Sequence, residues 1–368
     1  MLKSLPVLMY HYISSWPNSI AVAPEVFESH LEAMTQAGYR GISLAEAEAY
    51  LRDGRELPKG SALITFDDGF LDNFVFAWPL LEKHGHKGTV FTVTNKIVDE
   101  EHPRPTLKDV WEGYVGMNEL PQVNIHGGRT GGEGVRVRTD LFFSWKEARL
   151  MENSGVMSMA AHTHTHRSVF TGPNFKTLFK PGVRRRTFDR IDQYVIYGLP
   201  DFRRGAALAN EAFLPSEELY GIISATVPQE YDAAKRFFAD PGREEEIMRR
   251  IQDLPPERLG RMETPAEYEA RIRADLTLCK QIQERELGRP VHSLAWPWGE
   301  FSKQALDIAK ELGFSVFFTT ALGPNLPGKS ADAAYRFKAK NKSAKWMISR
   351  LGIYSKPLTA RVYGTLHR

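Results

Sequence analysis

Short apolar runs alternate with amphipathic segments along much of the chain. The runs predict buried strands at residues 5–13, 61–66, 88–94, 156–161, 291–295 and 314–319. The amphipathic segments predict helices at residues 24–38, 73–84, 144–153, 264–288 and 302–312. Strands and helices that alternate with short connections predict an α/β fold in which helices cover a parallel sheet.

The helix at 264–288 has the clearest boundaries. Thr264 and Glu267 form a capping box with Pro265 in the first turn, and Gly288 ends the helix. Cys279 falls on the apolar face of this helix, so we expect a buried core thiol. It is the single cysteine of the chain, which excludes an intramolecular disulfide and a zinc site built from thiolates.

Two segments interrupt the alternation. Residues 99–140 are rich in Gly and Pro, which predicts an extended excursion with little helix. Residues 170–262 are too long for a simple loop and contain predicted helices at 230–239 and 243–252, so we expect a cap or subdomain there. The predicted organisation has core segments at 1–98, 141–169 and 263–337, insertions at 99–140 and 170–262, and a tail at 338–368.

The composition is that of a globular protein, with 42% hydrophobic and 25% charged residues in a chain of 368. Disordered and collagen-like chains are therefore excluded. No stretch approaches the roughly 18 to 20 apolar residues that a membrane-spanning helix needs. Because Met1–Tyr10 lacks the apolar core of a secretory signal, we expect the protein to stay in the cytoplasm.

The tail is basic. Nine Lys or Arg residues and no Asp or Glu lie from Arg336 to the C-terminus, and since the net charge is +3, the other residues sum to −6. Residues 345–354 mix apolar and basic side chains, which fits two interpretations. One is an amphipathic segment on an anionic surface, peripheral at the inner face of the membrane. The other is a helix that packs on the body of the protein and leaves its lysines in water. With either interpretation, we expect no nucleic-acid partner.

Three predicted strands are followed by residues that can carry chemistry. Asp67 and Asp68 follow the strand at 61–66, HTHTH at 162–166 follows 156–161, and WPWG at 296–299 follows 291–295. Active sites of parallel α/β folds lie at the carboxyl ends of strands. Adjacent carboxylates after a buried strand need solvent, a partner or a cation, although DDG alone also fits an ordinary turn. Neutral imidazoles with a carboxylate form a good site for a divalent metal.

In this order, TFDDG, HTHTH and WPWG, with the opening LPVLMYHYI, give a sequence that resembles the polysaccharide deacetylases of the NodB-homology group, carbohydrate esterase family four. The resemblance covers residues 5–98, 141–169 and 265–337, and it is strongest to the branch that includes bacterial poly-N-acetylglucosamine deacetylases. It implies an irregular (β/α)7 barrel with both insertions at its mouth. It also implies metal-dependent N-deacetylation of N-acetylhexosamine units in a bacterial surface polysaccharide or its precursor, with Zn, Co or Ni as the metal.

The resemblance also implies a role for individual residues. Asp67 matches the catalytic base of the family, whereas Asp68, His162 and His166 match its metal ligands. Trp298 occupies the position whose backbone N–H serves the oxyanion. A bound cation activates water and polarises the acetyl carbonyl, and a carboxylate base accepts the water proton, so these residue types suit the hydrolysis of an acetamide.

The sequence departs from the family pattern at two positions. Ala295 stands where many members have an Arg that steadies the base, and Arg336 is our candidate for that role. The late Leu-x-His motif that supplies the catalytic acid is absent, and His11 is a candidate substitute; a core-edge histidine bonded to backbone is the alternative. His164 falls at a variable position of the motif, so we leave it outside the ligand set.

Aromatic residues near these motifs fit either the core or a sugar site. We expect Trp296, Pro297 and Trp298 to bind substrate, although Trp298 fits a core position equally well, and we expect Phe142 and Phe143 in the core.

Two other functions stay open. The enzyme could deacetylate a small or lipid-linked amino sugar, or the chain could be a carbohydrate-binding pseudoenzyme, a class that the intact Asp67 and its neighbours disfavour. Arg184–Arg186 fit contact with an anionic carrier or glycan, or a run of solvated charges.

Overall fold

The computed structural model describes residues 1–16, 18–100, 102–121, 141–182 and 191–367. Residues 101 and 122–140 of the first insertion, and Arg184–Arg186, lie outside the described residues.

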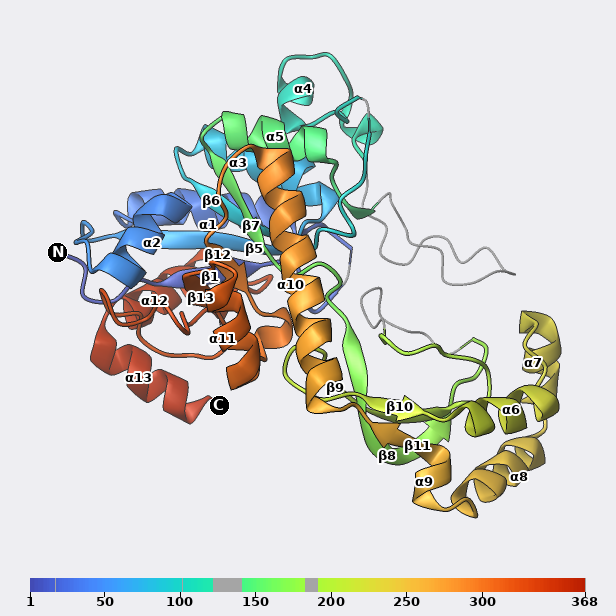
Figure 1. Cartoon of the computed structure of the whole chain (residues 1–368). Coiled ribbons are helices and arrows are strands. Elements are labelled where there is room, and N and C mark those ends of the chain that lie inside the picture. The colour runs from blue at the N-terminus through green and yellow to red at the C-terminus, as the bar shows by residue number, and fades with distance from the viewer. Residues whose placement is uncertain (17, 101, 122–140, 183–190, 368) are drawn as a thin grey trace.

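A curled sheet of parallel strands forms the centre of the molecule (Figure 1). Among the described residues, the main path of this sheet consists of β1 (Val7–Tyr10), β5 (Ser61–Asp68), β6 (Gly88–Thr92), β7 (Met157–Ala161), β12 (Ser293–Ala295), β13 (Val316–Phe318) and β14 (Phe337–Lys338). They run in the order β13-β12-β7-β6-β5-β1-β14, and β4 (Arg40–Gly41) pairs with β5 outside this path. The two ends of the path meet, because Phe318 bridges in parallel to Ala334, three residues before β14. The predicted α/β barrel is therefore confirmed.

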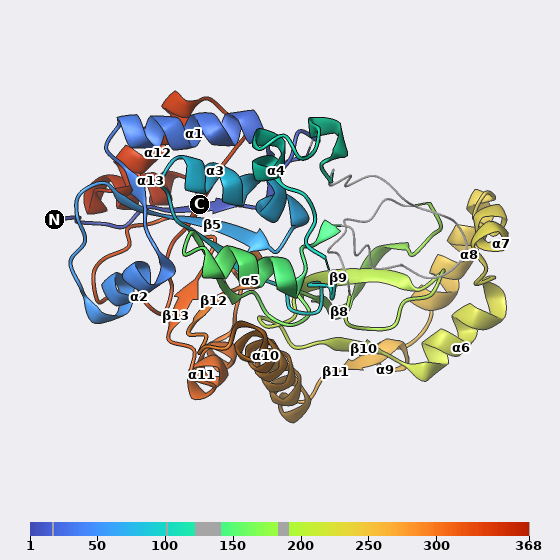
Figure 2. The same ribbon diagram turned by 90° about the horizontal axis from the view of Figure 1, so that it is seen from above.

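Helices cover the outside of this sheet. They are α1 (Pro24–Gln36), α2 (Leu44–Asp53), α3 (Trp78–Lys83), α5 (Trp145–Asn153), α10 (Pro265–Leu287), α11 (Lys303–Glu311), α12 (Ala344–Tyr354) and α13 (Pro357–Leu366). Figure 2 shows α1 and α12 on one side of the strands and α10 and α11 on the opposite side. The predicted capping box of α10 is confirmed, since Thr264 accepts from the backbone N–H of Glu267 and Gly288 ends the helix in the left-handed region. The helix predicted at 73–84 divides into a π-helical turn, η1 (Asn73–Ala77), and α3.

The second insertion builds a separate subdomain, which extends from the barrel in Figure 1. Its strands are β8 (Ser168–Leu178), β9 (Pro200–Ala206), β10 (Phe213–Pro215) and β11 (Gly260–Met262), and its helices are α6 (Glu217–Thr226), α7 (Tyr231–Phe237), α8 (Pro241–Gln252) and α9 (Pro256–Leu259). The predicted helices at 230–239 and 243–252 are confirmed as α7 and α8. Sequence patterns did not reveal the antiparallel β8–β9 ribbon or α6. Phe170, Phe202, Ile223 and Ile251 belong to a hydrophobic cluster of this subdomain.

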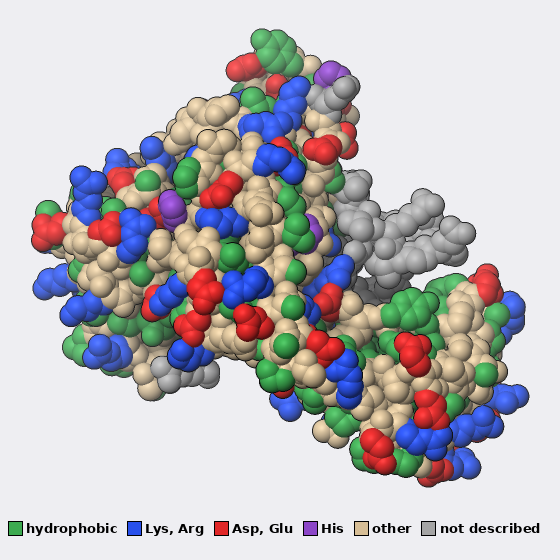
Figure 3. Space-filling model, viewed as in Figure 1, with side chains coloured by type: hydrophobic (Ala, Val, Ile, Leu, Met, Phe, Trp, Pro, Cys, Tyr) green, Lys and Arg blue, Asp and Glu red, His purple; other side chains and the backbone are tan. Residues whose placement is uncertain are grey.

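Three short elements remain. They are β2 (Tyr12–Ile13), β3 (Ala21–Val22) and α4 (Leu107–Trp111), followed by a 3-10 turn, η2 (Met117–Glu119). Phe142, Phe143 and Cys279 are buried, as expected. On the face shown in Figure 3, basic and acidic side chains are interspersed over barrel and subdomain alike.

The basic tail folds back onto the barrel. Helix α12 packs against α1, and its Met347, Leu351 and Tyr354 are buried. These contacts fit the packed-helix interpretation of residues 345–354. Helix α13, in contrast, leaves Leu358 and Val362 largely exposed, at 73% and 52% of their surface. No helix within the described ranges is long and apolar enough to span a bilayer.

Candidate metal centre and active site

The register of the parallel sheet brings the chemical motifs to one end of the barrel. Asp68 at the end of β5 pairs with Thr92 of β6, and Thr92 pairs with Ala161 at the end of β7. His162 follows Ala161 directly, and Trp296 follows the last residue of β12. Side chains about ninety residues apart in sequence therefore lie beside one another, because they leave strands of one parallel sheet at the same edge.

Asp68, His162 and His166 form a compact, buried group. Asp68 Oδ1 lies 3.5 Å from His162 Nε2 and 3.6 Å from His166 Nε2, and one ligand atom from each residue lies within 4.8 Å of the others. Asp68 Oδ1 accepts no hydrogen bond from the described part of the chain. His162 Nδ1 lies 2.8 Å from the carbonyl oxygen of Ala295, a contact that places the proton on Nδ1 and leaves the Nε2 lone pair for a cation. This donor set fits a divalent metal ion.

The local electrostatics suit metal binding. Burial alone would raise the pKa of Asp68, but the imidazoles of His162 and His166 beside it lower this pKa to about 2. Burial lowers the pKa of His166 to about 4, against the attraction of Asp68. At neutral pH the carboxylate is therefore ionised and His166 is neutral. Burial also opposes charge on His162, yet Asp67 and Asp68 raise its pKa, so that a proton and a cation compete for this ligand.

The backbone around this group is strained. Among the described residues, four that are not glycine have positive φ: Asp68 (81°), Thr163 (69°), His166 (49°) and Trp298 (55°). Residues other than glycine rarely adopt positive φ, and such backbone strain is typical of functional sites. All four residues lie in the three motifs, and the rings of His166 and Trp298 are 4.5 Å apart.

Arg336 binds Asp67 through both carboxylate oxygens. Arg336 Nη1 donates to Oδ1 at 2.6 Å and Nη2 donates to Oδ2 at 2.9 Å, while its Nε donates to the carbonyl oxygen of Thr319 at 3.0 Å. The guanidinium is fully buried. Burial alone would raise the pKa of Asp67, but Arg336, His162 and His11 hold it below its ordinary value. An arginine entering from just before β14 thus lies where the candidate base needs a partner, in a site where Ala295 offers none.

His11 and His164 lie at the edge of the group. The pKa of His11 is lowered by burial, which outweighs the attraction of Asp68 and Asp67, and its Nδ1 makes no hydrogen bond within the described chain. A structural histidine bonded to backbone was the alternative, and His11 Nδ1 makes no backbone contact that supports it. His164 Nδ1 lies 2.9 Å from Thr94 Oγ1, and His164 is not part of the compact group.

The two tryptophans of the WPWG turn differ in burial. Trp296 is completely buried and stacks on Phe301 at 5.0 Å and on Phe317 at 5.7 Å, and Pro297 is also buried. This burial does not fit the prediction that Trp296 and Pro297 bind substrate, because Trp296 directly follows the core strand β12 and packs into the core. The 3-10 turn that follows carries Trp298 outward, with 38% of its surface exposed.

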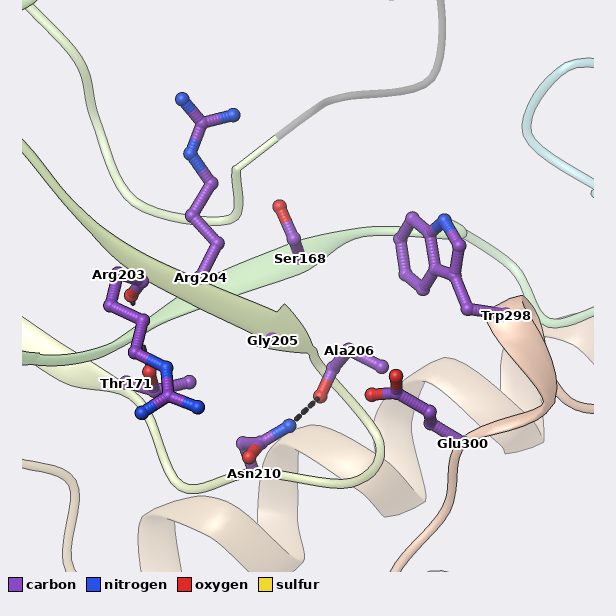
Figure 4. Close-up of a pocket in the computed structure, with 9 residues that line it drawn as sticks. All are labelled: Ser168, Thr171, Arg203, Arg204, Gly205, Ala206, Asn210, Trp298 and Glu300. Atoms are coloured by element: carbon purple, nitrogen blue, oxygen red, sulfur yellow. Dashed lines mark hydrogen bonds between the residues drawn. The ribbon is translucent and has the colours of Figure 1, made fainter. Parts of the chain in front are cut away.

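A cavity of about 560 Å³ adjoins Trp298 (Figure 4). It is lined by Ser168, Thr171, Arg203, Arg204, Gly205, Ala206, Asn210, Trp298 and Glu300. Figure 4 shows Trp298 and Glu300 at one end and Arg203 at the other. Of this set, only Trp298 was predicted from the sequence. Most of the other residues are brought together by the pairing of β8 with β9 and carry no local motif.

Comparisons with known proteins agree on the family. The polysaccharide deacetylase family model matches residues 54–189. YxkH of Bacillus subtilis (strain 168), whose name assigns it to the same family, is 40% identical over 98 residues, 27% of this chain and 35% of that protein. Poly-beta-1,6-N-acetyl-D-glucosamine N-deacetylase of Escherichia coli (strain K12) is 22% identical over 291 residues, 79% of this chain and 29% of that protein. This chain thus spans only about a third of either relative.

Solved structures share the fold. The BpsB deacetylase domain from Bordetella bronchiseptica has a TM-score of 0.56 at 20% identity, covering 91% of this chain and 96% of that chain. IcaB from Ammonifex degensii has a TM-score of 0.53 at 18% identity, covering 95% and 97%. At these identities the likeness concerns the fold alone. With the order of the three motifs, the match of the family model leads to one conclusion: residues 54–189 match a polysaccharide deacetylase domain, and the chain is similar to bacterial poly-N-acetylglucosamine deacetylases.

Proposed function

We propose that this protein is a metal-dependent N-deacetylase of N-acetylhexosamine units in a bacterial surface polysaccharide or its precursor. The observation that carries the proposal is the arrangement of Asp68, His162 and His166 around one point, with Asp67 beside them on Arg336. The similarity to an Escherichia coli enzyme named for poly-beta-1,6-N-acetyl-D-glucosamine supports this class of glycan.

The metal would be held by Asp68 Oδ1 and the Nε2 atoms of His162 and His166. Zinc suits this donor set, and Co or Ni are alternatives. When bound, a divalent cation lowers the pKa of water from about 15.7 to about 7 and polarises a carbonyl oxygen.

The other steps use side chains and backbone of this chain. Asp67 accepts a proton from the attacking water, a role typically worth about 10²- to 10⁴-fold in rate. Arg336 orients Asp67 and keeps it ionised. The backbone N–H of Trp298 donates to the developing oxyanion. The departing amine receives its proton from His11 or from Asp67 itself.

The cavity beside Trp298 favours an oligomeric substrate over a small or lipid-linked amino sugar. It begins at the exposed indole, which can stack on a sugar ring, and extends along the β8–β9 ribbon with side-chain hydroxyl, amide and guanidinium groups. We propose that it receives sugars next to the one being deacetylated.

The test is acetate release from N-acetylglucosamine oligomers of one to five sugars by Zn²⁺-loaded protein. We expect release to rise with oligomer length and to be lost in Asp67→Asn. Oligomer binding without acetate release would support the carbohydrate-binding pseudoenzyme instead. A rate independent of length would argue for the small amino sugar.

A further inference from the structure

The carboxylate of Asp275, on α10, lies against the loop that carries both candidate histidine ligands. Its Oδ1 accepts a hydrogen bond from the backbone N–H of His164 at 2.8 Å. Its Oδ2 accepts from the backbone N–H of Thr165 at 3.1 Å and from the Thr165 hydroxyl at 2.5 Å. Three donors from two consecutive residues therefore converge on one carboxylate, and these two residues lie between His162 and His166.

This loop requires support because its backbone is strained. Thr163 has φ 69° and His166 has φ 49°, in the left-handed region that side chains disfavour. Within the loop, the backbone N–H of His166 donates to Thr163 Oγ1 at 3.0 Å. From outside, Asp275 holds the two residues between the strained positions. Charged acceptors make the stronger hydrogen bonds, so a carboxylate is well suited to maintain such a conformation.

The same face of α10 fixes the neighbouring structure at helical spacing. Two turns after Asp275, Gln283 Nε2 donates to the carbonyl oxygen of Ala160 in β7 at 2.8 Å. One turn before Asp275, Arg271 donates to the carbonyl oxygens of Ala207 at 2.7 Å and Asn210 at 3.1 Å, in the loop beside the cavity. Helix α10 thus contacts the strand that leads into the histidine motif, the motif itself and the wall of the cavity.

We propose that Asp275 is a positioning residue of the metal centre, which holds the 163–166 loop so that His162 and His166 both face Asp68. The inference rests on the metal site of the proposed function and deepens it, because it makes metal affinity depend on a residue outside the ligand set. No motif marks Asp275 in the sequence; it is placed by the packing of α10 on β7.

The test is the affinity of Asp275→Asn for Zn²⁺, measured by competition with a chromogenic chelator. The amide replaces an acceptor oxygen by an NH₂ group that faces the N–H and O–H donors of the loop. Loss of a partner that orients metal ligands typically costs about 10- to 100-fold in metal affinity, and we expect a loss of this size. We also expect a changed absorption spectrum of the Co²⁺-loaded variant, which reports ligand geometry without requiring turnover.

The matched control is Glu263→Gln. Glu263 lies two residues before α10, accepts from the backbone N–H of Ala212 at 2.8 Å and binds Arg271 on the helix at 2.8 Å. It therefore anchors the same helix through a carboxylate but does not touch the histidine loop. We expect this variant to lose stability and to keep the Zn²⁺ affinity of the wild type.

Three outcomes would overturn the inference. The first is wild-type Zn²⁺ affinity and an unchanged Co²⁺ spectrum in Asp275→Asn, and the second is an equal loss of affinity in Glu263→Gln. If Asp275→Asn does not fold, Thr165→Val removes the hydroxyl donor alone. The third outcome that would overturn the inference is wild-type Zn²⁺ affinity in Thr165→Val, whereas a severalfold loss of affinity supports it. Absence of Zn²⁺ binding by the wild type would refute the metal centre itself, and with it the proposed function.

Discussion

The pairing of Arg336 with Asp67 makes a testable prediction about catalysis and stability. In Arg336→Gln the carboxylate loses both guanidinium contacts, at 2.6 and 2.9 Å, and stays buried. Breaking a buried ion pair from one side typically costs about 3–5 kcal/mol in the free energy of unfolding. We expect a loss in this range, measured by urea unfolding at neutral pH.

The pKa of Asp67 should move in a defined direction. Burial raises it and Arg336 is the first of the charges that lower it, so the variant should have a higher pKa than the wild type. Asp67 must be ionised to accept a proton, and the acid limb of kcat/KM should therefore shift to higher pH in Arg336→Gln. Each pKa unit corresponds to about 1.36 kcal/mol. At neutral pH the loss in rate is limited to the about 10²- to 10⁴-fold that a general base supplies.

Stability should follow the same linkage. A depressed folded-state pKa stabilises the wild type above the unfolded pKa of about 3.9, and this contribution is lost as the pH falls through the folded value. The stability difference between wild type and Arg336→Gln should therefore be largest at neutral pH and narrow in acid.

The assays are acetate release against pH at saturating Zn²⁺, and urea unfolding at several pH values. Arg104→Gln is the control, because Arg104 binds the buried carboxylate of Glu147 at 2.6 and 2.9 Å, an ion pair that does not include Asp67. This variant should lose stability and keep the pH profile of the wild type. An acid limb of Arg336→Gln that coincides with that of the wild type would refute the reasoning.

Three further predictions concern other parts of the molecule. Burial raises the pKa of Asp72 to about 8, so folding takes up a proton between about pH 4 and 8, and stability falls as the pH rises through this range. In urea unfolding, Asp72→Asn should flatten the dependence of stability on pH. An equal pH dependence in variant and wild type would contradict this prediction. Trp296→Ala should cost about 3–5 kcal/mol in thermal or urea unfolding, whereas Trp298→Ala should chiefly weaken oligosaccharide binding. Leu358→Asp with Val362→Asp should reduce sedimentation with phosphatidylglycerol vesicles if α13 and the basic tail bind an anionic membrane; unchanged sedimentation would exclude this surface.

The barrel could be predicted from the sequence because the patterns that indicate its strands and helices are local. Each central strand is a short apolar run, and the side chains of Asp68 and His162 follow their strands directly, so a parallel sheet must bring them to one edge. Short β4 and β14 carry no such run and were not predicted. The same limit applies to the β8–β9 ribbon, whose polar residues and register shifts hide its pairing.

The roles of several side chains depend on tertiary packing and could not be predicted from the sequence. Both tryptophans of WPWG looked like candidates for a sugar site, and only the backbone of the turn determines that Trp296 enters the core and Trp298 faces solvent. Asp275 resembles any acidic residue on an amphipathic helix until α10 is packed on β7. Arg336 could be named from the sequence only because the family pattern left an arginine missing.

The long separation between Asp67 and Arg336 has a consequence for biosynthesis. The two residues are 269 positions apart, so a ribosome must release most of the barrel before the carboxylate meets its counter-ion. Until then Asp67 has to remain hydrated, and the first strands of the barrel cannot close tightly around it. Nascent chains that stop short of residue 336 should therefore hold this end of the barrel open, and hydrolytic competence should arise only after Arg336 has left the ribosome.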